Sequence, residues 1–237
     1  MTLHTTTRST RTANRPSRSR RARTVAGVAG LLMLAVPLAA CGSENDESGS
    51  QERVEALAEL PDLNNGQQTE IELDPGFLEA LDTLGLTPGV VGDAGLDGAT
   101  LSFPITGGNV SLFEPGSVPN YVTGQIFHEN SGLSLTAGDT VVKLANFNVD
   151  PEFSRVYGDV ELNGDIVALS AYLFRLNGST LQPIETDDAG NTVLTGSGVF
   201  VSDVAAGLLN DTFGTDAVTD QLQVGVATVT VGTPTDG

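Results

Sequence analysis

The sequence predicts a mainly β protein: an antiparallel sandwich or a partly open barrel of about nine strands, with two or three short helices. Asn163-Gly164 joins two runs typical of strands, and Asn-Gly is a strong hairpin signal because both central residues need positive φ. In LQVGVATVTV, Leu222, Val224 and Val226 alternate onto one face. Local turns connect most of these runs, which favours antiparallel pairing.

Further turn signals divide the middle of the chain into strands. Two dipeptides, Gly107-Gly108 and Asn177-Gly178, each predict a tight hairpin. Clusters of turn residues predict longer hairpin loops at Glu129–Gly132, Ala137–Asp139 and Asp187–Asn191.

Two helices are marked at both ends by residues that suit helix caps. The first lies in LDPGFLEALDTLG and the second in SDVAAGLLNDTFG. Short polar side chains suit the N-cap, and glycine suits the left-handed position after the last turn. The expected N-caps are Asp74 and either Ser202 or Asp203, and the expected ends are Gly85 and Gly214.

A third short helix is expected before the first strand. Val54, Leu57 and Leu60 recur at helical spacing within residues 52–60. Pro61 follows and would end the helix.

The first forty residues are typical of an export signal. Seven arginines and no acid occupy residues 8–23, and residues 24–40 carry no charge. A basic head before a short apolar run indicates a secretory signal, because the run is too short for a membrane-spanning helix. The run ends in LAAC at Cys41, which resembles the lipobox of bacterial lipoproteins. The resemblance implies cleavage before Cys41, diacylation of its sulfur and residence on the extracytoplasmic face of the cell membrane.

This resemblance divides the chain into three parts. A lipoprotein signal peptide is expected over 1–40, an acidic flexible tether over 41–52 and a single β-rich extracytoplasmic domain over 53–237. The tether contains Gly, Ser, Asn, Asp and Glu but has no apolar group to bury after Cys41, so it is expected to act as a spacer.

After Cys41 the chain is strongly acidic. It holds all thirty acidic residues but only four basic ones, a net charge of −26 (four minus thirty); the basic residues are Arg53, Lys143, Arg155 and Arg175. Such a surface repels nucleic acid and anionic headgroups, so the membrane is expected as a partner only through the lipid anchor. A basic protein or divalent cations are compatible partners. Because Cys41 is the sole cysteine, disulfides and cysteine metal sites are not expected.

No motif in the sequence marks an active site. His4 precedes Cys41, so His128 is the one histidine after it, and no G-x-S-x-G pattern occurs. Paired carboxylates leave a hydrolase open, although thirty acids make a chance pair easy to find. The expected function is therefore binding or envelope architecture for an unknown ligand, without catalysis, a metal site or an obligatory cofactor.

A second resemblance lies between Tyr121 and Leu162. The pattern G-x-I-x-H ending at His128, followed by G-L-x-L and N-F-x-V-D, is similar to the haem-transport-associated HtaA domain, and the helix in SDVAAGLLNDTFG is similar to that family's closing helix. The resemblance implies a surface domain that receives or passes haem, with a tyrosine on iron and a supporting histidine. Tyr121 and His128 are therefore candidate ligand-binding residues. The family's early Trp and ligand Tyr have no counterpart between 42 and 120.

The spacing of the two candidates argues against a local pair. Tyr121 and His128 are seven positions apart, so on one regular strand they would point to opposite faces. His128 would share a face with Val122 and Ile126, where a histidine is more often a hydrogen-bonded core residue than a ligand. Haem binding and a core role for His128 therefore both remain open.

Overall fold

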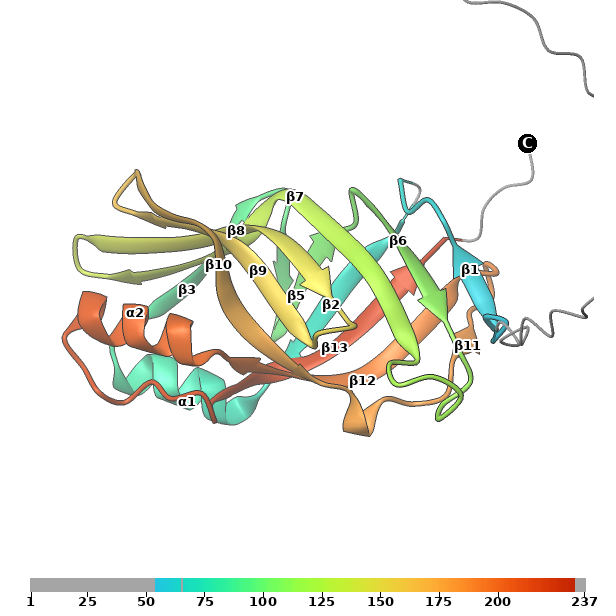
Figure 1. Cartoon of the computed structure of the whole chain (residues 1–237). Coiled ribbons are helices and arrows are strands. Elements are labelled where there is room, and N and C mark those ends of the chain that lie inside the picture. Colours follow the sequence, from blue (N-terminus) through green and yellow to red (C-terminus); the bar gives the residue numbers. More distant parts are fainter. Residues whose placement is uncertain (1–53, 65, 233–237) are drawn as a thin grey trace, which may run out of the picture. The chain divides into compact units, whose positions relative to one another are not determined.

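The computed structural model describes residues 54–64 and 66–232 (Figure 1). These residues form one curled antiparallel sheet with two α-helices at one end. The expected signal peptide, Cys41 and most of the tether lie outside the described residues. No helix in the described ranges has the length and apolar character needed to cross a membrane.

Thirteen strands make up the sheet. They are β1 (Ala58–Leu60), β2 (Gln68–Leu73), β3 (Thr87–Gly92), β4 (Gly95–Asp97), β5 (Thr100–Pro104), β6 (Gly107–Leu112), β7 (Val122–Ala137), β8 (Thr140–Asp150), β9 (Arg155–Leu162), β10 (Asp165–Asn177), β11 (Glu185–Thr186), β12 (Thr192–Val201) and β13 (Gln223–Val231). The helices are α1 (Pro75–Thr83), α2 (Asp203–Phe213) and the 3-10 turn η1 (Gly178–Thr180).

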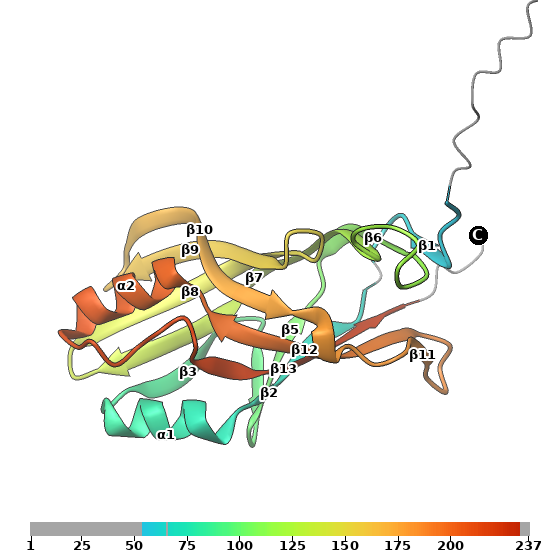
Figure 2. The same ribbon diagram turned by 60° about the horizontal axis from the view of Figure 1, so that its bottom comes forward.

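The strand order is β1-β6-β7-β8-β9-β10-β12-β13-β2-β5-β4, with β3 added to β7 and β11 added to β12. The sheet curls into a half-barrel, so the predicted fold class is confirmed. Figures 1 and 2 show α1 and α2 at one end of the half-barrel and β1, β6 and β11 at the other. Three of the thirteen strands have only two or three residues, which partly explains why the sequence indicates about nine.

The capping residues of α1 and α2 act as predicted. Asp74 Oδ1 accepts a hydrogen bond from Gly76 N at 2.7 Å, and Ser202 Oγ accepts one from Ala205 N at 3.0 Å. Gly85 and Gly214 each have φ of 66°, the left-handed conformation that ends a helix. Local side-chain chemistry therefore determines where both helices begin and end.

The expected helix over 52–60 is wrong in its described part. Ala58–Leu60 is strand β1, which pairs with Val110–Leu112 of β6. Only Leu60 is buried, whereas Val54 and Leu57 are exposed. A helical spacing of three apolar residues is weak information, and pairing with a distant strand overrides it.

The turn predictions have mixed outcomes. Asn163-Gly164 forms the β9–β10 hairpin with φ of 51° and 95°, and the loops at Ala137–Asp139 and Asp187–Asn191 also join paired strands. By contrast, Gly107-Gly108 lies inside β6, and Asn177 is extended and caps η1. Both hairpin predictions are wrong: Gly108 allows a close approach to the backbone of β7, and Asn177 accepts from Ser179 N as the N-cap of η1.

Glu129–Gly132 is also not a loop. It lies within the 16-residue strand β7, where the register with β8 shifts between His128 and Gly132. Similar shifts occur between Ala145 and Asn148 in β8 and between Ala168 and Ala171 in β10. Bulges of this kind bend strands and increase their twist, so this belt of bulges contributes to the curl of the sheet.

Polar side chains replace the missing ladder bonds along the belt of bulges. Asn146 Oδ1 accepts from Asn130 N at 2.9 Å. Asp159 accepts from Asn146 Nδ2 at 3.0 Å and from Ser170 N at 3.0 Å. The backbones of Asn130, Asn146 and Ser170 have positive φ, which the neighbouring hydrogen bonds hold in place.

The core consists of two hydrophobic clusters. The larger one joins the sheet to α1 and α2 through Phe77, Leu81, Ala205 and Leu209. The smaller one gathers residues near the other end: Leu60, Leu63, Ile105, Val110, Leu112, Ile126 and Val231. Both clusters lie between Leu60 and Val231, so a chain of residues 50–237 retains all of them and is expected to fold on its own.

Candidate functional site

The interior of the curled sheet holds a cavity of about 230 Å³. Side chains from β2, β5, β6, β7, β8, β9, β10, β12 and β13 line it, and most of them are apolar. The polar side chains among the lining residues are Thr69, Asn120, Tyr121, His128, Ser154 and Ser197. No Lys, Arg, Asp or Glu lines it. An apolar cavity of about 150 Å³ is known to hold benzene in another protein, so this volume suits a somewhat larger molecule.

The rim of the cavity is formed by three connections between strands. The β6–β7 loop supplies Asn120 and Tyr121, the β8–β9 turn supplies Pro151 and Ser154, and Gly178 belongs to η1. The Tyr121 hydroxyl donates to the Gly178 carbonyl at 3.3 Å, so one hydrogen bond joins two sides of the rim. Tyr121 is half-buried and Asn120 is exposed, which places the opening of the cavity here.

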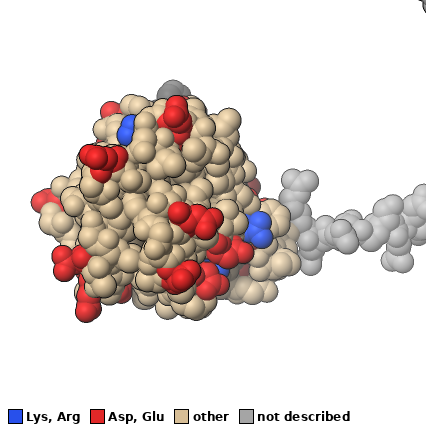
Figure 3. All heavy atoms as spheres, turned by 90° about the vertical axis from the view of Figure 1, so that its left-hand side faces the viewer, with Lys and Arg blue, Asp and Glu red and all other residues tan. Residues whose placement is uncertain are grey.

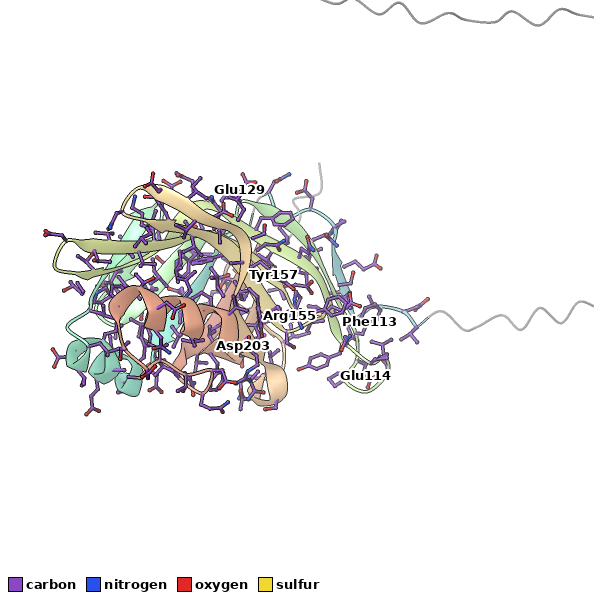
Figure 4. The ribbon with its side chains drawn as sticks, turned by 60° about the vertical axis from the view of Figure 1, so that its left-hand side comes forward. Phe113, Glu114, Glu129, Arg155, Tyr157 and Asp203 are labelled. Atoms are coloured by element: carbon purple, nitrogen blue, oxygen red, sulfur yellow. The ribbon has the colours of Figure 1, made fainter. Side chains whose placement is uncertain are left out.

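Several side chains near the β6–β7 loop and on β9 do not line the cavity. Figure 4 shows Phe113 and Glu114 at the β6–β7 loop, with Arg155 and Tyr157 on β9. Arg155 lies over the Tyr172 ring at 5.0 Å from its centroid and donates to the Tyr157 hydroxyl at 3.3 Å. Neither Arg155 nor Tyr172 lines the cavity, so this contact belongs to the outer surface.

His128 lies in the wall of the cavity with Val122 and Ile126, as the alternation predicts. Its side chain is 1% exposed. Nε2 lies 2.8 Å from Thr69 Oγ1 on β2, and the Phe103 ring packs edge-on at 6.4 Å. Nδ1 has no hydrogen-bond partner among the described residues.

Tyr121 and His128 line the same cavity, contrary to the expectation of opposite faces. Tyr121 precedes the first residue of β7, so strand alternation does not apply to it. His128 is a buried core residue, as expected, and it also lies in the cavity wall, because the cavity lies inside the core.

Burial lowers the pKa of His128 to about 4, and the nearby Phe147 backbone opposes this shift more weakly. The imidazole is therefore neutral at pH 7. A neutral imidazole has one N–H donor and one acceptor nitrogen. Nε2 is engaged with Thr69, and the Phe147 backbone is a further neighbour of the buried ring.

Hydrogen bonds of the backbone on both sides of His128 join β7 to the connection between β5 and β6. Thr106, between β5 and β6, donates from its N to the Phe127 carbonyl at 2.8 Å, and its hydroxyl accepts from Glu129 N at 2.9 Å. The Ser131 hydroxyl donates to the His128 carbonyl at 3.2 Å. The Glu129 side chain is exposed (Figure 4). His128 is thus held by rigid neighbours on both sides.

Sequence reasoning missed Thr69 and Ser197. Thr69 is 59 positions before His128, and only the curling of the sheet brings β2 and β7 together. Thr69 lies in an alternating strand pattern, and nothing in its neighbouring residues marks it as part of a site. Ser197 lies in Gly196-Ser197-Gly198, which lacks the flanking pattern of a hydrolase motif and marks no other kind of site.

The described residues offer little support for metal or charge chemistry. They contain no group of three or more His, Cys, Asp or Glu side chains placed to hold a metal ion. One ion pair occurs in the described ranges, between Lys143 and Glu161 at 2.6 Å. On the face in Figure 3, acidic side chains are spread over the surface and basic ones are few.

The lining residues do not fit a buried haem. The propionates of a haem would find no basic side chain among the lining residues. The Nε2 atom of His128 is also occupied by Thr69. Tyr121, at the rim, and His128, in the wall, are the lining side chains of types that bind haem iron in other proteins.

No protein-family model and no curated protein matches this chain. Among solved structures, the C-terminal domain of HtaA from Corynebacterium glutamicum is similar at 14% identity and a TM-score of 0.46, over 73% of this chain and 99% of that one. A domain-swapped dimer of a histidine-to-alanine variant of that domain has 15% identity and a TM-score of 0.39, over 66% and 91% of the chains.

Proposed function

We propose that this chain is a lipid-anchored, extracytoplasmic binding protein that holds a small, mainly apolar ligand inside its curled sheet. The cavity of about 230 Å³, with its apolar wall, few polar groups and half-buried rim, carries the proposal. Ligand sites in proteins are typically concave and apolar, with a small number of placed polar groups. The absence of lining carboxylates gives no support to the hydrolase alternative.

Binding is tested by titrating residues 50–237 with ethylbenzene, a compact hydrocarbon. We expect saturable binding by calorimetry and a rise in melting temperature, because a ligand that binds only the folded state stabilises it. Leu194→Phe places extra volume in the cavity and should weaken binding at least tenfold. The control is Leu208→Phe, at a half-buried residue of α2 outside the cavity, which should bind normally. Equal binding by both variants would contradict the proposed site.

The anchor rests on the LAAC motif at Cys41. Two acyl chains hold a protein on a membrane stably, whereas one does so only marginally. We expect the full chain to fractionate with membranes of a bacterial host and a Cys41→Ser chain to leave them. An intact arginine-rich leader, found by mass spectrometry in the membrane form, would contradict processing at Cys41.

A second candidate is haem binding in the HtaA manner, favoured by the placement of Tyr121 and His128 along one cavity. Because a buried haem does not fit, such binding would involve the rim. A hemin titration decides between the two: a saturable Soret shift that Tyr121→Phe abolishes supports haem, and ethylbenzene binding without that shift supports the small apolar ligand.

A further inference from the structure

The opening of the cavity lies next to the point where the chain enters the sheet. Leu57 N donates to the Leu112 carbonyl at 2.6 Å. Ala58 of β1 pairs with Leu112 of β6, which pairs in turn with Val122 of β7. Val122 lines the cavity beside Tyr121 of the rim. Neighbouring strands lie about 4.8 Å apart, so about 10 Å separates β1 from the strand that begins at the rim.

Exposed apolar side chains surround this opening. Phe153, in the β8–β9 turn between the lining residues Pro151 and Ser154, is 65% exposed. Leu57 is 61% exposed, and Ile184, between η1 and β11, is 41% exposed. With three half-buried residues of the rim connections, they form a set that we call the collar: Leu57, Phe113, Val118, Phe153, Leu181 and Ile184. Gathered apolar surface of this kind marks a contact with a partner or a membrane.

The charges beside the collar are negative. The three connections of the rim each carry one exposed glutamate, namely Glu114, Glu152 and Glu185. Residues 113–121, 151–154 and 178–185 contain no Lys or Arg. Proteins that reach anionic lipid by charge use basic residues, so the collar is suited to neutral lipid and to apolar contact. Such a contact is weak by itself and needs a second attachment to the same surface.

The lipid anchor expected at Cys41 supplies that attachment at the right end of the domain. Twelve residues separate Cys41 from Val54, and that length of chain reaches at most about 45 Å. The sixteen residues of β7 extend over about 50 Å, from the rim toward the end that holds α1 and α2. The anchor therefore confines the collar near the bilayer, raises its effective concentration there, and confines the helix end much less.

We propose that the collar rests on the lipid bilayer, so that the cavity opens onto the membrane and receives molecules dissolved in lipid. This inference rests on the proposed function, because it uses both the anchor and the cavity. It adds a second membrane contact to the anchor itself. Another exposed apolar set, Ile166, Val167 and Leu169, lies on the β9–β10 hairpin at the opposite end of the sheet and provides a control.

The composition of the chain permits a direct test. It has one cysteine and no tryptophan. Residues 41–237 are coupled through the Cys41 thiol to a maleimide lipid in phosphatidylcholine vesicles whose acyl chains carry bromine, which quenches tryptophan fluorescence on contact. Phe153→Trp and Leu169→Trp each supply one tryptophan, at positions 65% and 69% exposed. We expect the Phe153→Trp chain to lose at least half of its emission relative to unbrominated vesicles, and the Leu169→Trp chain to keep its emission.

The failures of the inference and of the proposed function are distinguishable. Quenching that is absent from both variants, or at least as strong in Leu169→Trp, overturns the docking of the collar. The ethylbenzene titration of residues 50–237 needs no membrane, so ethylbenzene binding without quenching removes the docking and leaves the binding function. If ethylbenzene does not bind, the proposed function fails and the inference fails with it.

Discussion

At the scale of single residues, His128 couples the stability of the fold to pH. Burial lowers its pKa from 6.5 to about 4, so the unfolded chain binds a proton more readily than the folded chain between these values. The resulting stability is fully present above pH 6.5 and is lost as pH falls toward 4.

The expected loss from this residue is about 3 kcal/mol between pH 7 and pH 4, at about 1.4 kcal/mol for each pKa unit. Urea unfolding of the wild type and of His128→Gln across that pH range measures this contribution of His128. The carboxylates contribute equally to both proteins, so they cancel in the difference between the two free energies of unfolding. The free energy of unfolding of the wild type should fall more steeply with acid than that of the variant. Parallel curves would contradict a neutral, buried imidazole.

Gly92 makes a second residue-scale prediction. Its φ is +61°, and a Cβ there would lie only 1.8 Å from the Asn130 carbonyl oxygen in the belt of bulges. Gly92→Ala should therefore lower the free energy of unfolding by about 2–4 kcal/mol. Gly207 in α2 is the matched control, since an added Cβ meets nothing within 4 Å.

Gly207→Ala should raise stability by about 1 kcal/mol, because alanine is the better helix former. Both variants are measured by urea unfolding at pH 7. Equal effects of the two substitutions would show that the close approach of Gly92 to the bulge is not real.

At the scale of elements, Ser202 ties helix α2 to the sheet. Its hydroxyl accepts from Ala205 N and donates to the Tyr172 carbonyl at 2.6 Å, and its side chain is 1% exposed. Asp74 caps α1 with a single hydrogen bond near the surface. Ser202→Ala should cost about 2–3 kcal/mol, since it leaves buried groups unpaired, whereas Asp74→Ala should cost about 1 kcal/mol. Thermal unfolding followed by circular dichroism gives both values, and a reversed order would contradict the buried role of Ser202.

Features set by a few neighbouring residues were predictable from sequence. Both helices, their caps and the Asn163-Gly164 turn belong to this class, because each depends on local φ preferences and side-chain caps. The same reasoning fails where a distant strand decides. Asn177-Gly178 caps a 3-10 turn, and β1 forms through pairing with β6.

The candidate site shows the same division between local and distant information. Alternation along β7 predicts that His128 points to the inner face of the sheet. It does not predict the partner of His128, because Thr69 lies on β2. Tyr121 joined the cavity because β7 begins one residue later, a boundary that no turn signal marked. The three register shifts of the belt of bulges, which contribute to the curl of the sheet, are not readable from residue patterns.

At the scale of the whole molecule, the charge of the chain opposes folding. The part after Cys41 carries thirty acidic and four basic residues, and one ion pair occurs within the described ranges. Repulsion among exposed carboxylates weakens as the Debye length falls from about 30 Å at 0.01 M salt to about 3 Å at 1 M. We therefore expect the melting temperature to rise by several degrees between these salt concentrations.

Magnesium chloride at matched ionic strength separates screening from binding. Equal melting temperatures in sodium and magnesium salts indicate screening alone, whereas an additional rise with magnesium indicates the divalent-cation binding that the acidic composition permits. A melting temperature that falls as salt increases would contradict net repulsion as the dominant surface term.

The claim that matters most for the whole molecule is that the space inside the curled sheet receives a ligand. A crystal structure of residues 50–237 grown with 2-(4-bromophenyl)ethanol tests it most directly, because bromine is located by its anomalous scattering. The account predicts a bromine peak inside the cavity, among its apolar lining residues. A cavity filled by repacked side chains, or a probe found only on the outer surface, would contradict it.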